Sequence, residues 1–295
     1  MDCNMYQTGV VLTMACNLKC KLCSNYSPYY HKPAHHSIDY LREEMRRYFS
    51  IVTHINKLMV TGGEPFLHPD LPLFVKEIKK YKEQLDTFGI ITNGGRLPSE
   101  ELLNAIEDFG DKFHILIDDY GPDLSIKATE IAEVLEARNI PYILRTYHGE
   151  ESHCGGWVYF GDLTEKKWNE EEAEELYSKC AYPQKYHFAF DMVDGAMYPC
   201  SACRRCKELG VADNYDEYID LFDDSLTIEQ QREKIANIYK RKSLVACTYC
   251  NGMHEESPRF TTARQLSEEE QECIRKGANQ YSEVQSMLGK VADGN

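Results

Sequence analysis

Twelve cysteines, and the uneven way in which they are spaced, constrain this chain more than any other feature of its sequence. Three of them, Cys16, Cys20 and Cys23, lie close together. No cysteine follows until residue 154, and eight lie between residues 154 and 273. In a reducing cytosol, so many thiols favour metal or redox chemistry over a framework of disulfides. The long gap between the two groups predicts two regions with separate metal chemistry.

The composition limits the class of protein. A chain of 295 residues usually forms about two domains. With 42% hydrophobic and 27% charged residues, this chain has enough apolar side chains to form a core. A net charge of −15 argues against binding to nucleic acid or to an anionic membrane surface, because both require clustered cations. No apolar run reaches the roughly 18 to 20 residues of a membrane span, and the N-terminus does not resemble a signal peptide. We therefore expect a cytoplasmic protein that binds neither nucleic acid nor membrane.

The first half of the chain alternates short β-rich runs with helical patterns, which is typical of βα units around a parallel sheet. Five such units fit before residue 150, fewer than the eight of a closed barrel. The sequence therefore predicts an α/β fold in which residues 1–150 form an open, partial parallel barrel. The expected strands span residues 9–13, 57–61, 88–92, 113–117 and 142–146, and the expected helices span residues 37–52, 70–84, 99–109 and 124–138.

The pattern changes after a boundary near residues 148–155. Residues 151–295 are expected to form a small α+β domain that is organised by its cysteines. Val193, Asp194 and Gly195 carry a hairpin signal of the Asp-Gly kind. The expected strands on either side of this turn span residues 187–192 and 196–198, and the expected helices span residues 168–178, 226–241 and 267–288.

The first cysteine group has the spacing C-x3-C-x2-C and directly follows the first expected strand. A structural zinc site takes four protein ligands, usually with C-x2-C pairs. Three cysteines in one loop, Cys16, Cys20 and Cys23, are better suited to a [4Fe–4S] cluster whose fourth iron stays open for a small molecule. A zinc knuckle that borrows a distant fourth ligand is the alternative.

Two further motifs follow the second and third expected strands. Gly62, Gly63, Glu64 and Pro65 end the second, and Thr92 with Asn93 ends the third. Together with the cysteine loop, they make residues 7 to 146 resemble the radical S-adenosylmethionine (radical SAM) superfamily. The resemblance implies a partial (β/α)6-like barrel. The residue before the third cysteine is usually aromatic in that family, whereas here it is Leu22.

The resemblance also implies a binding site for S-adenosylmethionine (SAM). Its amino and carboxylate groups would chelate the open iron. Gly62 and Gly63 would admit a close approach of the backbone, and Glu64, followed by Pro65, offers an acceptor to the cofactor's ammonium.

Four more residues are assigned to the cofactor or the substrate by the same resemblance. Thr92 and Asn93 would lie near the methionine moiety or the ribose. Asp118, at the end of the fourth strand, would accept from ribose hydroxyls. Arg145, on the fifth, would pair with the methionine carboxylate or with substrate. For Asp118 and Arg145, a solvent-facing charge at a strand end is the alternative.

The second cysteine group resembles a twitch module, in which four cysteines hold one auxiliary [4Fe–4S] cluster. The longer SPASM module needs a dense run of later cysteines, and residues 251–272 contain none. A run that includes Cys203 and Cys206 resembles three ligands of a ferredoxin cluster and is the rival arrangement, while zinc is a further alternative. Cys154 is either a hydrogen-atom donor or cluster ligand, or a residue packed in a glycine loop. The four favoured ligands are Cys180, Cys200, Cys247 and Cys250.

Within the superfamily, the layout is similar to that of the 2-deoxy-scyllo-inosamine dehydrogenases. This implies an oxidoreductase in which a 5′-deoxyadenosyl radical abstracts hydrogen from a small polar, sugar- or cyclitol-like substrate, and the auxiliary cluster accepts an electron. Arg145 would orient the reacting hydroxyl, because its very high pKa makes it a poor base. A flavodoxin or ferredoxin would supply electrons.

Two other functions are open. One is a maturase of the same superfamily that cross-links, epimerises or forms thioethers in a ribosomal peptide. The other is an iron–sulfur electron carrier or sensor without catalytic activity.

Overall fold

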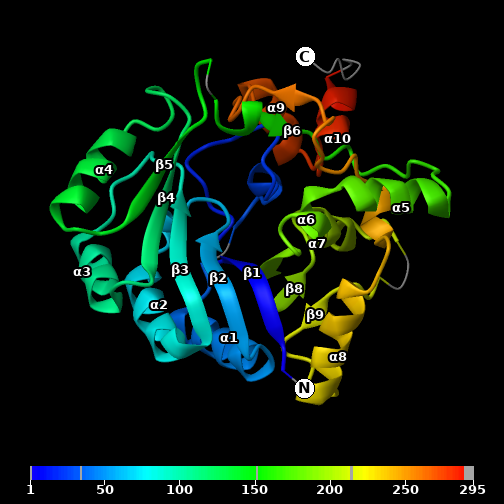
Figure 1. Cartoon of the computed structure of the whole chain (residues 1–295). Coiled ribbons are helices and arrows are strands. Elements are labelled where there is room, and N and C mark those ends of the chain that lie inside the picture. The colour runs from blue at the N-terminus through cyan, green and yellow to red at the C-terminus, as the bar shows by residue number, and fades with distance from the viewer. Residues whose placement is uncertain (1, 34, 151, 213–214, 289–295) are drawn as a thin grey trace.

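The structure is a computed structural model that describes residues 2–33, 35–150, 152–212 and 215–288 (Figure 1). Its centre is one eight-stranded sheet with the strand order β5-β4-β3-β2-β1-β7-β8-β9. The first five strands pair in parallel with their neighbours, as the alternation of strands and helices predicts. They are β1 (Asn4–Val11), β2 (His54–Thr61), β3 (Leu85–Thr92), β4 (Phe113–Asp119) and β5 (Tyr142–Thr146).

Helices between these strands cover one face of the sheet, on the left and lower part of Figure 1. They pack through a core in which Phe74, Phe88, Phe109 and Phe113 are fully or almost fully buried. Such large apolar side chains stabilise the layer because their burial removes apolar surface from water. The predicted α/β class, a partial parallel barrel, is confirmed. The helices are α1 (Ile38–Ile51), α2 (Leu71–Ile78), α3 (Glu100–Phe109) and α4 (Ala128–Ala137).

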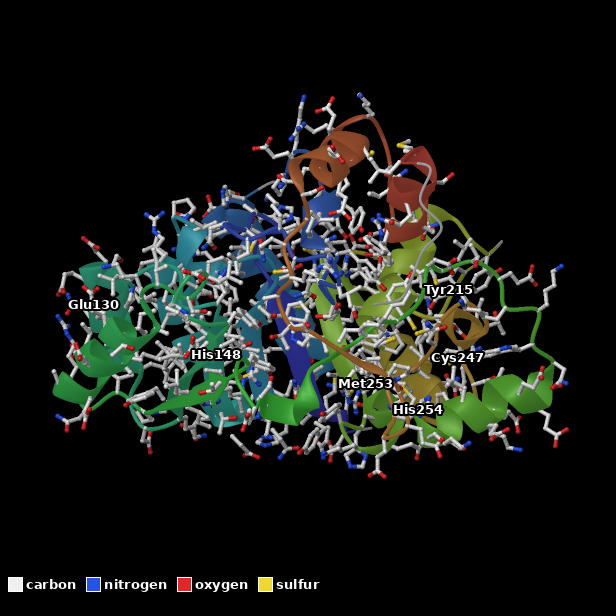
Figure 2. All side chains as sticks on the ribbon, turned by 90° about the horizontal axis from the view of Figure 1, so that it is seen from above. Glu130, His148, Tyr215, Cys247, Met253 and His254 are labelled. Carbon is white, nitrogen blue, oxygen red and sulfur yellow. The ribbon has the colours of Figure 1, made fainter. Side chains whose placement is uncertain are left out.

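The sheet continues past residue 150. Strand β7 (Ala189–Val193) pairs in parallel with β1, and a hairpin leads to β8 (Ala196–Tyr198) and then to β9 (Ile219–Asp220). A sixth parallel strand therefore lies beside β1, contributed by the second half of the chain. Figure 2, seen from above, shows the resulting elongated shape, with Glu130 of α4 at one end and Tyr215 and Cys247 toward the other.

The remaining elements surround the hairpin and the carboxyl ends of the strands. Leu266 donates its N–H to the carbonyl of Lys19, and Lys21 donates to that of Arg264, so the C-terminal segment crosses the first cysteine loop. No helix in the described part of the chain is long and apolar enough to cross a membrane. These elements are β6 (Trp157–Val158), α5 (Glu170–Lys179), α6 (Ala181–Gln184), α7 (Ser201–Leu209), α8 (Ile228–Tyr239), β10 (Arg259–Phe260), α9 (Glu268–Arg275) and α10 (Tyr281–Met287), with 3-10 turns η1 (Ser27–Tyr29), η2 (Pro65–Leu67), η3 (Lys79–Gln84), η4 (His153–Gly155) and η5 (Val245–Thr248).

Several local expectations differ from the structure. The helix expected over residues 267–288 is two helices, α9 and α10, because Gly277 between them adopts a φ of +108° that ends the first. The helix expected over residues 70–84 changes to the 3-10 turn η3 after Ile78. The first strand begins at Asn4 rather than at residue 9, and α7 lies in a segment for which the sequence predicted no helix.

The predicted turn at Gly195 is anchored by a buried carboxylate of α1. The N–H of Gly195 donates to Oε1 of Glu44 at 2.8 Å, and Gly195 has a φ of +78°, which favours glycine. Burial raises the pKa of Glu44 from 4.5 to about 7. The folded state therefore holds a proton on Glu44 at pH values at which the unfolded chain has released it.

We expect the free energy of unfolding to fall as the pH rises from about 4.5 to 7, because the native state binds more protons there than the unfolded state. Glu44→Gln should reduce this loss, which is on the order of 1–3 kcal/mol for this residue. Anaerobic urea unfolding between pH 5 and 7.5 measures it. Glu43→Gln is the matched control. Arg46 and Arg47 lower the pKa of Glu43 to about 2, so this change should leave the dependence of the unfolding free energy on pH as it is. An equal effect of both variants would contradict the assignment to Glu44.

Candidate functional site

The three cysteines of the first group lie in the loop that leaves β1 at the carboxyl edge of the sheet. The side-chain amide of Asn93, at the end of β3, lies 3.6 Å from the sulfur of Cys16. The amide of Gln265 lies 3.2 Å from the sulfur of Cys20. The loop packs against Tyr120 and Trp157. The fold thus gathers the three thiols and directs N–H donors at two of them.

Burial governs the charge of these thiols. It raises the pKa of Cys16 to about 11 and that of Cys20 further, and the neighbouring Cys23 acts in the same direction on both. Binding of metal by thiolates therefore has to release protons from this loop. Across the described ranges, no three His, Cys, Asp or Glu side chains converge on the position of one metal ion. An iron–sulfur cube takes each thiolate on a different iron, and N–H donors to sulfur tune such clusters, so the donor set fits that group.

The two glycines of the Gly-Gly-Glu-Pro motif are pressed against the start of the cysteine loop. The N–H of Gly63 donates to the carbonyl of Thr13 at 2.9 Å, and that of Glu64 to the carbonyl of Ala15 at 2.8 Å. A Cβ on Gly63 would lie 2.1 Å from the carbonyl oxygen of Ala15, and one on Gly62 would lie 2.5 Å from that of Thr13. In this structure, the glycines permit a close approach of two loops. Their approach to a cofactor stays a prediction.

Gly63→Ala is expected to destabilise the fold by about 1–3 kcal/mol, because the added methyl group displaces the backbone that leads into Cys16. Thermal unfolding under anaerobic conditions measures the loss. Gly149→Ala is the control: it has open space around its Cβ and a φ of +76°, so it reports only the backbone cost of about 1 kcal/mol. Gly63 has no positive φ, so the backbone cost seen at Gly149 does not apply to it, and a loss well below about 1 kcal/mol at Gly63 would show that the close approach does not matter.

Glu64 joins the motif to the end of β3. Its fully buried carboxylate accepts from the hydroxyl of Thr92 at 2.9 Å, from the N–H of Asn93 at 2.8 Å and from the N–H of Phe66 at 3.0 Å. Burial raises its pKa to about 7. Pro65 begins the turn η2. Both carboxylate oxygens have partners within the chain, so Glu64 fixes Asn93 beside Cys16. Its contact with an ammonium group stays a prediction.

Asp118 and Arg145 are neighbours across β4 and β5. The Nε of Arg145 donates to Oδ1 of Asp118 at 2.6 Å, and the hydroxyl of Tyr120 lies 3.3 Å from Oδ2. Burial raises the pKa of Asp118, and the Arg145 guanidinium opposes this shift. Asp118 is 7% exposed and the Arg145 side chain is 23% exposed. The pair is therefore a fixed, largely buried charge couple rather than two solvent-facing strand ends.

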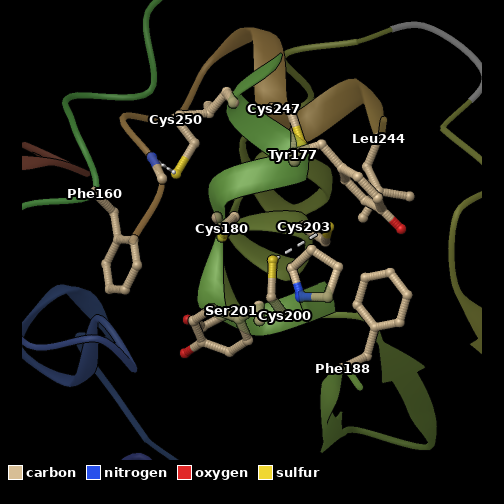
Figure 3. A pocket seen from close by; sticks show the side chains of 16 residues that line it. Phe160, Tyr177, Cys180, Phe188, Cys200, Ser201, Cys203, Leu244, Cys247 and Cys250 are labelled. Carbon is tan, nitrogen blue, oxygen red and sulfur yellow. Dashed lines mark hydrogen bonds between the residues drawn. The ribbon is translucent and has the colours of Figure 1, made fainter. Parts of the chain in front are cut away.

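The second cysteine group surrounds one cavity with apolar walls, which include Phe160, Phe188 and Leu244 (Figure 3). The four ligands favoured from the sequence all line it, and Cys203 is a fifth thiol, with its sulfur 3.4 Å from that of Cys200. Cys206 is buried but is not part of the lining. Thiols that face one another across apolar walls fit an iron–sulfur cluster by the chemistry of their donors. The cysteines of the lining are Cys180, Cys200, Cys203, Cys247 and Cys250.

Two arginines of α7, which the sequence reading did not single out, join the two cysteine groups. Arg204 is fully buried and donates to the carbonyl of Asn25 at 3.1 Å. The guanidinium of Arg205 lies 5.6 Å from the ring centroid of Tyr26, whose N–H donates to the carbonyl of Cys23. Helix α7 begins just after Cys200, so it packs directly on the segment that follows Cys23. The sequence feature that could have identified these arginines is the pair of adjacent charges between Cys203 and Cys206.

A cavity of about 460 Å³ lies beside both cysteine groups. Leu22 and Ser24, on either side of Cys23, form part of its wall, and so does Ala181, which follows Cys180. Arg145 reaches it from β5, and the exposed Cys154 also lines it. Further lining residues are Met253 and His254, which Figure 2 labels. A bound molecule of sugar size would contact the surroundings of both groups.

Known proteins are similar in sequence to the first half of this chain. Residues 10–145 match the radical SAM superfamily. The GTP 3′,8-cyclase of Nautilia profundicola is 32% identical over 124 residues, which are 41% of this chain and 37% of that protein. A probable GTP 3′,8-cyclase of Methanococcus aeolicus is 33% identical over 129 residues, 41% of this chain and 40% of that protein. The chain thus spans well under half the length of these relatives.

Solved structures resemble the chain over most of its length. BtrN in complex with AdoMet and 2-DOIA has a TM-score of 0.50 at 16% identity, covering 90% of this chain and 100% of that one. The protein anSMEcpe with bound AdoMet has a TM-score of 0.51 at 14% identity, covering 96% and 97%. At these identities, the likeness shows the shared fold.

Proposed function

We propose that this chain, whose residues 10–145 carry a radical SAM superfamily domain, is an oxidoreductase that removes hydrogen from a small polar, sugar- or cyclitol-like molecule. One observation carries the proposal: residues next to Cys23 of the first thiol group and next to Cys180 of the second line the same cavity of about 460 Å³. The family match supports a [4Fe–4S] cluster and SAM at Cys16, Cys20 and Cys23. When bound, they supply homolytic cleavage of a carbon–sulfur bond and so the abstraction of a hydrogen atom.

The second thiol group is proposed to hold an auxiliary [4Fe–4S] cluster. Cys180, Cys200, Cys247 and Cys250 are its proposed ligands, and apolar side chains make up most of the wall around them. Oxidation of an alcohol to a ketone removes one hydrogen atom, one proton and one electron. An auxiliary cluster held by these thiols would supply the acceptor for the electron, and the proton would pass to solvent. A flavodoxin or ferredoxin is the proposed donor of the electron that starts each turnover.

Arg145 is the proposed positioning residue for the reacting hydroxyl. Its ion pair with Asp118 at 2.6 Å fixes the guanidinium at the wall of the cavity. Burial acts to lower the pKa of Arg145, but the carboxylate of Asp118 outweighs it and keeps this pKa above its ordinary value. The side chain therefore donates hydrogen bonds and does not take a proton. It can hold the substrate oxygen without acting as the base.

The test is formation of 5′-deoxyadenosine by anaerobically reconstituted protein with SAM and dithionite. We expect slow formation without substrate and faster formation with a polyol of the correct class. Arg145→Lys should keep the slow reaction and reduce the stimulation roughly tenfold, because a lysine cannot reproduce the forked contact. Arg138→Lys, at an ion pair on the surface, is the control and should change neither rate.

Absence of 5′-deoxyadenosine would refute the proposal and favour an electron carrier. Stimulation by peptides alone would replace the oxidoreductase with a peptide-modifying enzyme of the same superfamily. If Arg145→Lys retains full stimulation, Arg145 has no role in positioning.

A further inference from the structure

The cavity beside both cysteine groups is lined by more cations than anions. Its cations come from four separate segments: β5, the end of α5, the residue after α6, and β10. Among the lining residues, all of which the structure describes, Glu255 is the one carboxylate. The chain as a whole carries a net charge of −15, so this lining does not follow from the general composition. The four cations are Arg145, Lys179, Lys185 and Arg259.

Two of these cations already have carboxylate partners and two do not. Arg145 pairs with Asp118 at 2.6 Å, and Lys179 pairs with Glu175 at 2.6 Å. Within the residues that the structure describes, neither Lys185 nor Arg259 forms an ion pair. Lys185 lies 5.9 Å from the ring centroid of Tyr186, and Arg259 donates to the carbonyl of His254 at 3.3 Å. Two positive charges at the cavity wall are therefore available to a ligand.

The other polar groups of the wall do not cancel these charges. Ser24, Tyr147, Tyr182 and Gln184 are neutral hydrogen-bonding side chains, and His153 and His254 add no negative charge. Glu255 contributes a single negative charge, so the lining keeps an excess of positive charge. Such a lining attracts an anion and repels a protonated amine, because a cleft lined mainly by charges of one sign focuses their electric field.

We propose that the substrate of this cavity carries an oxyanion, a phosphate ester or a carboxylate, which Lys185 and Arg259 bind. This inference rests on the proposed function, because it takes the cavity as the substrate site. The oxyanion lies toward the wall that Arg259 and Lys185 form, and the reacting carbon lies toward Leu22 and Ser24, next to Cys23. The guanidinium fork of Arg259 suits either oxyanion. An acidic sugar or a sugar phosphate fits this wall, and an aminocyclitol, which is a cation at neutral pH, does not.

The test is a matched series of sugars in calorimetric titrations of the reconstituted protein, saturated with SAM and without dithionite. Glucose 6-phosphate, glucuronate, glucose and glucosamine share a ring and differ in charge. We expect glucose 6-phosphate or glucuronate to bind at least roughly tenfold more tightly than glucose, and glucosamine to bind most weakly. The anion that binds more tightly shows whether the site prefers a phosphate ester or a carboxylate.

Lys185→Gln and Arg259→Gln should each weaken binding of the preferred anion roughly tenfold and leave glucose binding unchanged. Lys242→Gln removes an exposed lysine outside the cavity and should leave both unchanged. Equal binding of glucose and the anions by the SAM-saturated protein, loss of binding by Lys242→Gln, or anion binding that appears only when SAM is left out would each overturn the proposal. The proposed function is judged separately: if 5′-deoxyadenosine forms without any preference for anions, only this inference fails, and if none forms, both fail.

Discussion

Replacing Cys16, Cys20 and Cys23 together with alanine is expected to reduce the iron content from about eight to about four per chain and to abolish formation of 5′-deoxyadenosine. The three thiols lie in one loop, and donors from Asn93 and Gln265 point at two of their sulfur atoms. The second thiol group lies around a different cavity. Loss of the first group should therefore leave the second cluster in place. Iron and sulfide analysis after anaerobic reconstitution measures the change.

The reciprocal variant, in which the second thiol group is removed, tests the same assignment independently. Replacing Cys180, Cys247 and Cys250 with alanine should also leave about four irons but should retain cleavage of SAM. Cys3→Ala, at a buried cysteine that belongs to neither group, should keep about eight. About twelve irons in the wild type would indicate the longer module, and zinc in place of iron at either group would refute the assignment of that group.

Arg204→Met is expected to destabilise the protein by about 3–5 kcal/mol, because it removes one partner from a buried ionic network. Arg204 is fully buried, with Glu208 at 2.9 Å, Asp191 at 3.5 Å and the carbonyl of Asn25 at 3.1 Å. Removing the guanidinium leaves Asp191 in the interior without its counter-charge. Urea unfolding followed by circular dichroism under anaerobic conditions measures the loss.

A second substitution separates charge from packing. In the double variant Arg204→Met with Asp191→Leu, much of the stability should return, since no buried charge is left unpaired. Lys207→Met, on the same helix, should cost less than about 1 kcal/mol because it loses only a contact with the ring of Tyr218. A loss at Arg204 as small as that at Lys207 would show that α7 does not depend on the network.

The sequence predicts the first half of the molecule well, for a physical reason. Its strands are short apolar runs that end in polar motifs, and parallel strands bring their carboxyl ends to one edge. Cys16, Gly63, Asn93 and Asp118 therefore converge, although they are far apart along the chain. The thiols of the second group converge on one cavity as well, and their role as cluster ligands stays a prediction.

Other features depend on contacts that no local pattern records. The pairing of β7 with β1 joins segments that are more than 170 residues apart, and a pattern of alternating residues does not name its partner strand. The glycines at 62 and 63 signal a close approach, but only the fold shows that the approached group is the backbone of residues 13–15. The ring contacts of Arg205 and the cationic wall with Lys185 likewise arise from distant segments.

We infer that a cluster at Cys16, Cys20 and Cys23 has one iron that is free to bind SAM. Electron paramagnetic resonance of the dithionite-reduced protein, recorded with and without SAM, tests it most directly. We predict two cluster signals, of which one changes its g values when SAM is added, while the other, from the fully ligated cluster, stays the same. If neither signal changes when SAM is added, no iron of the cluster at Cys16, Cys20 and Cys23 binds SAM.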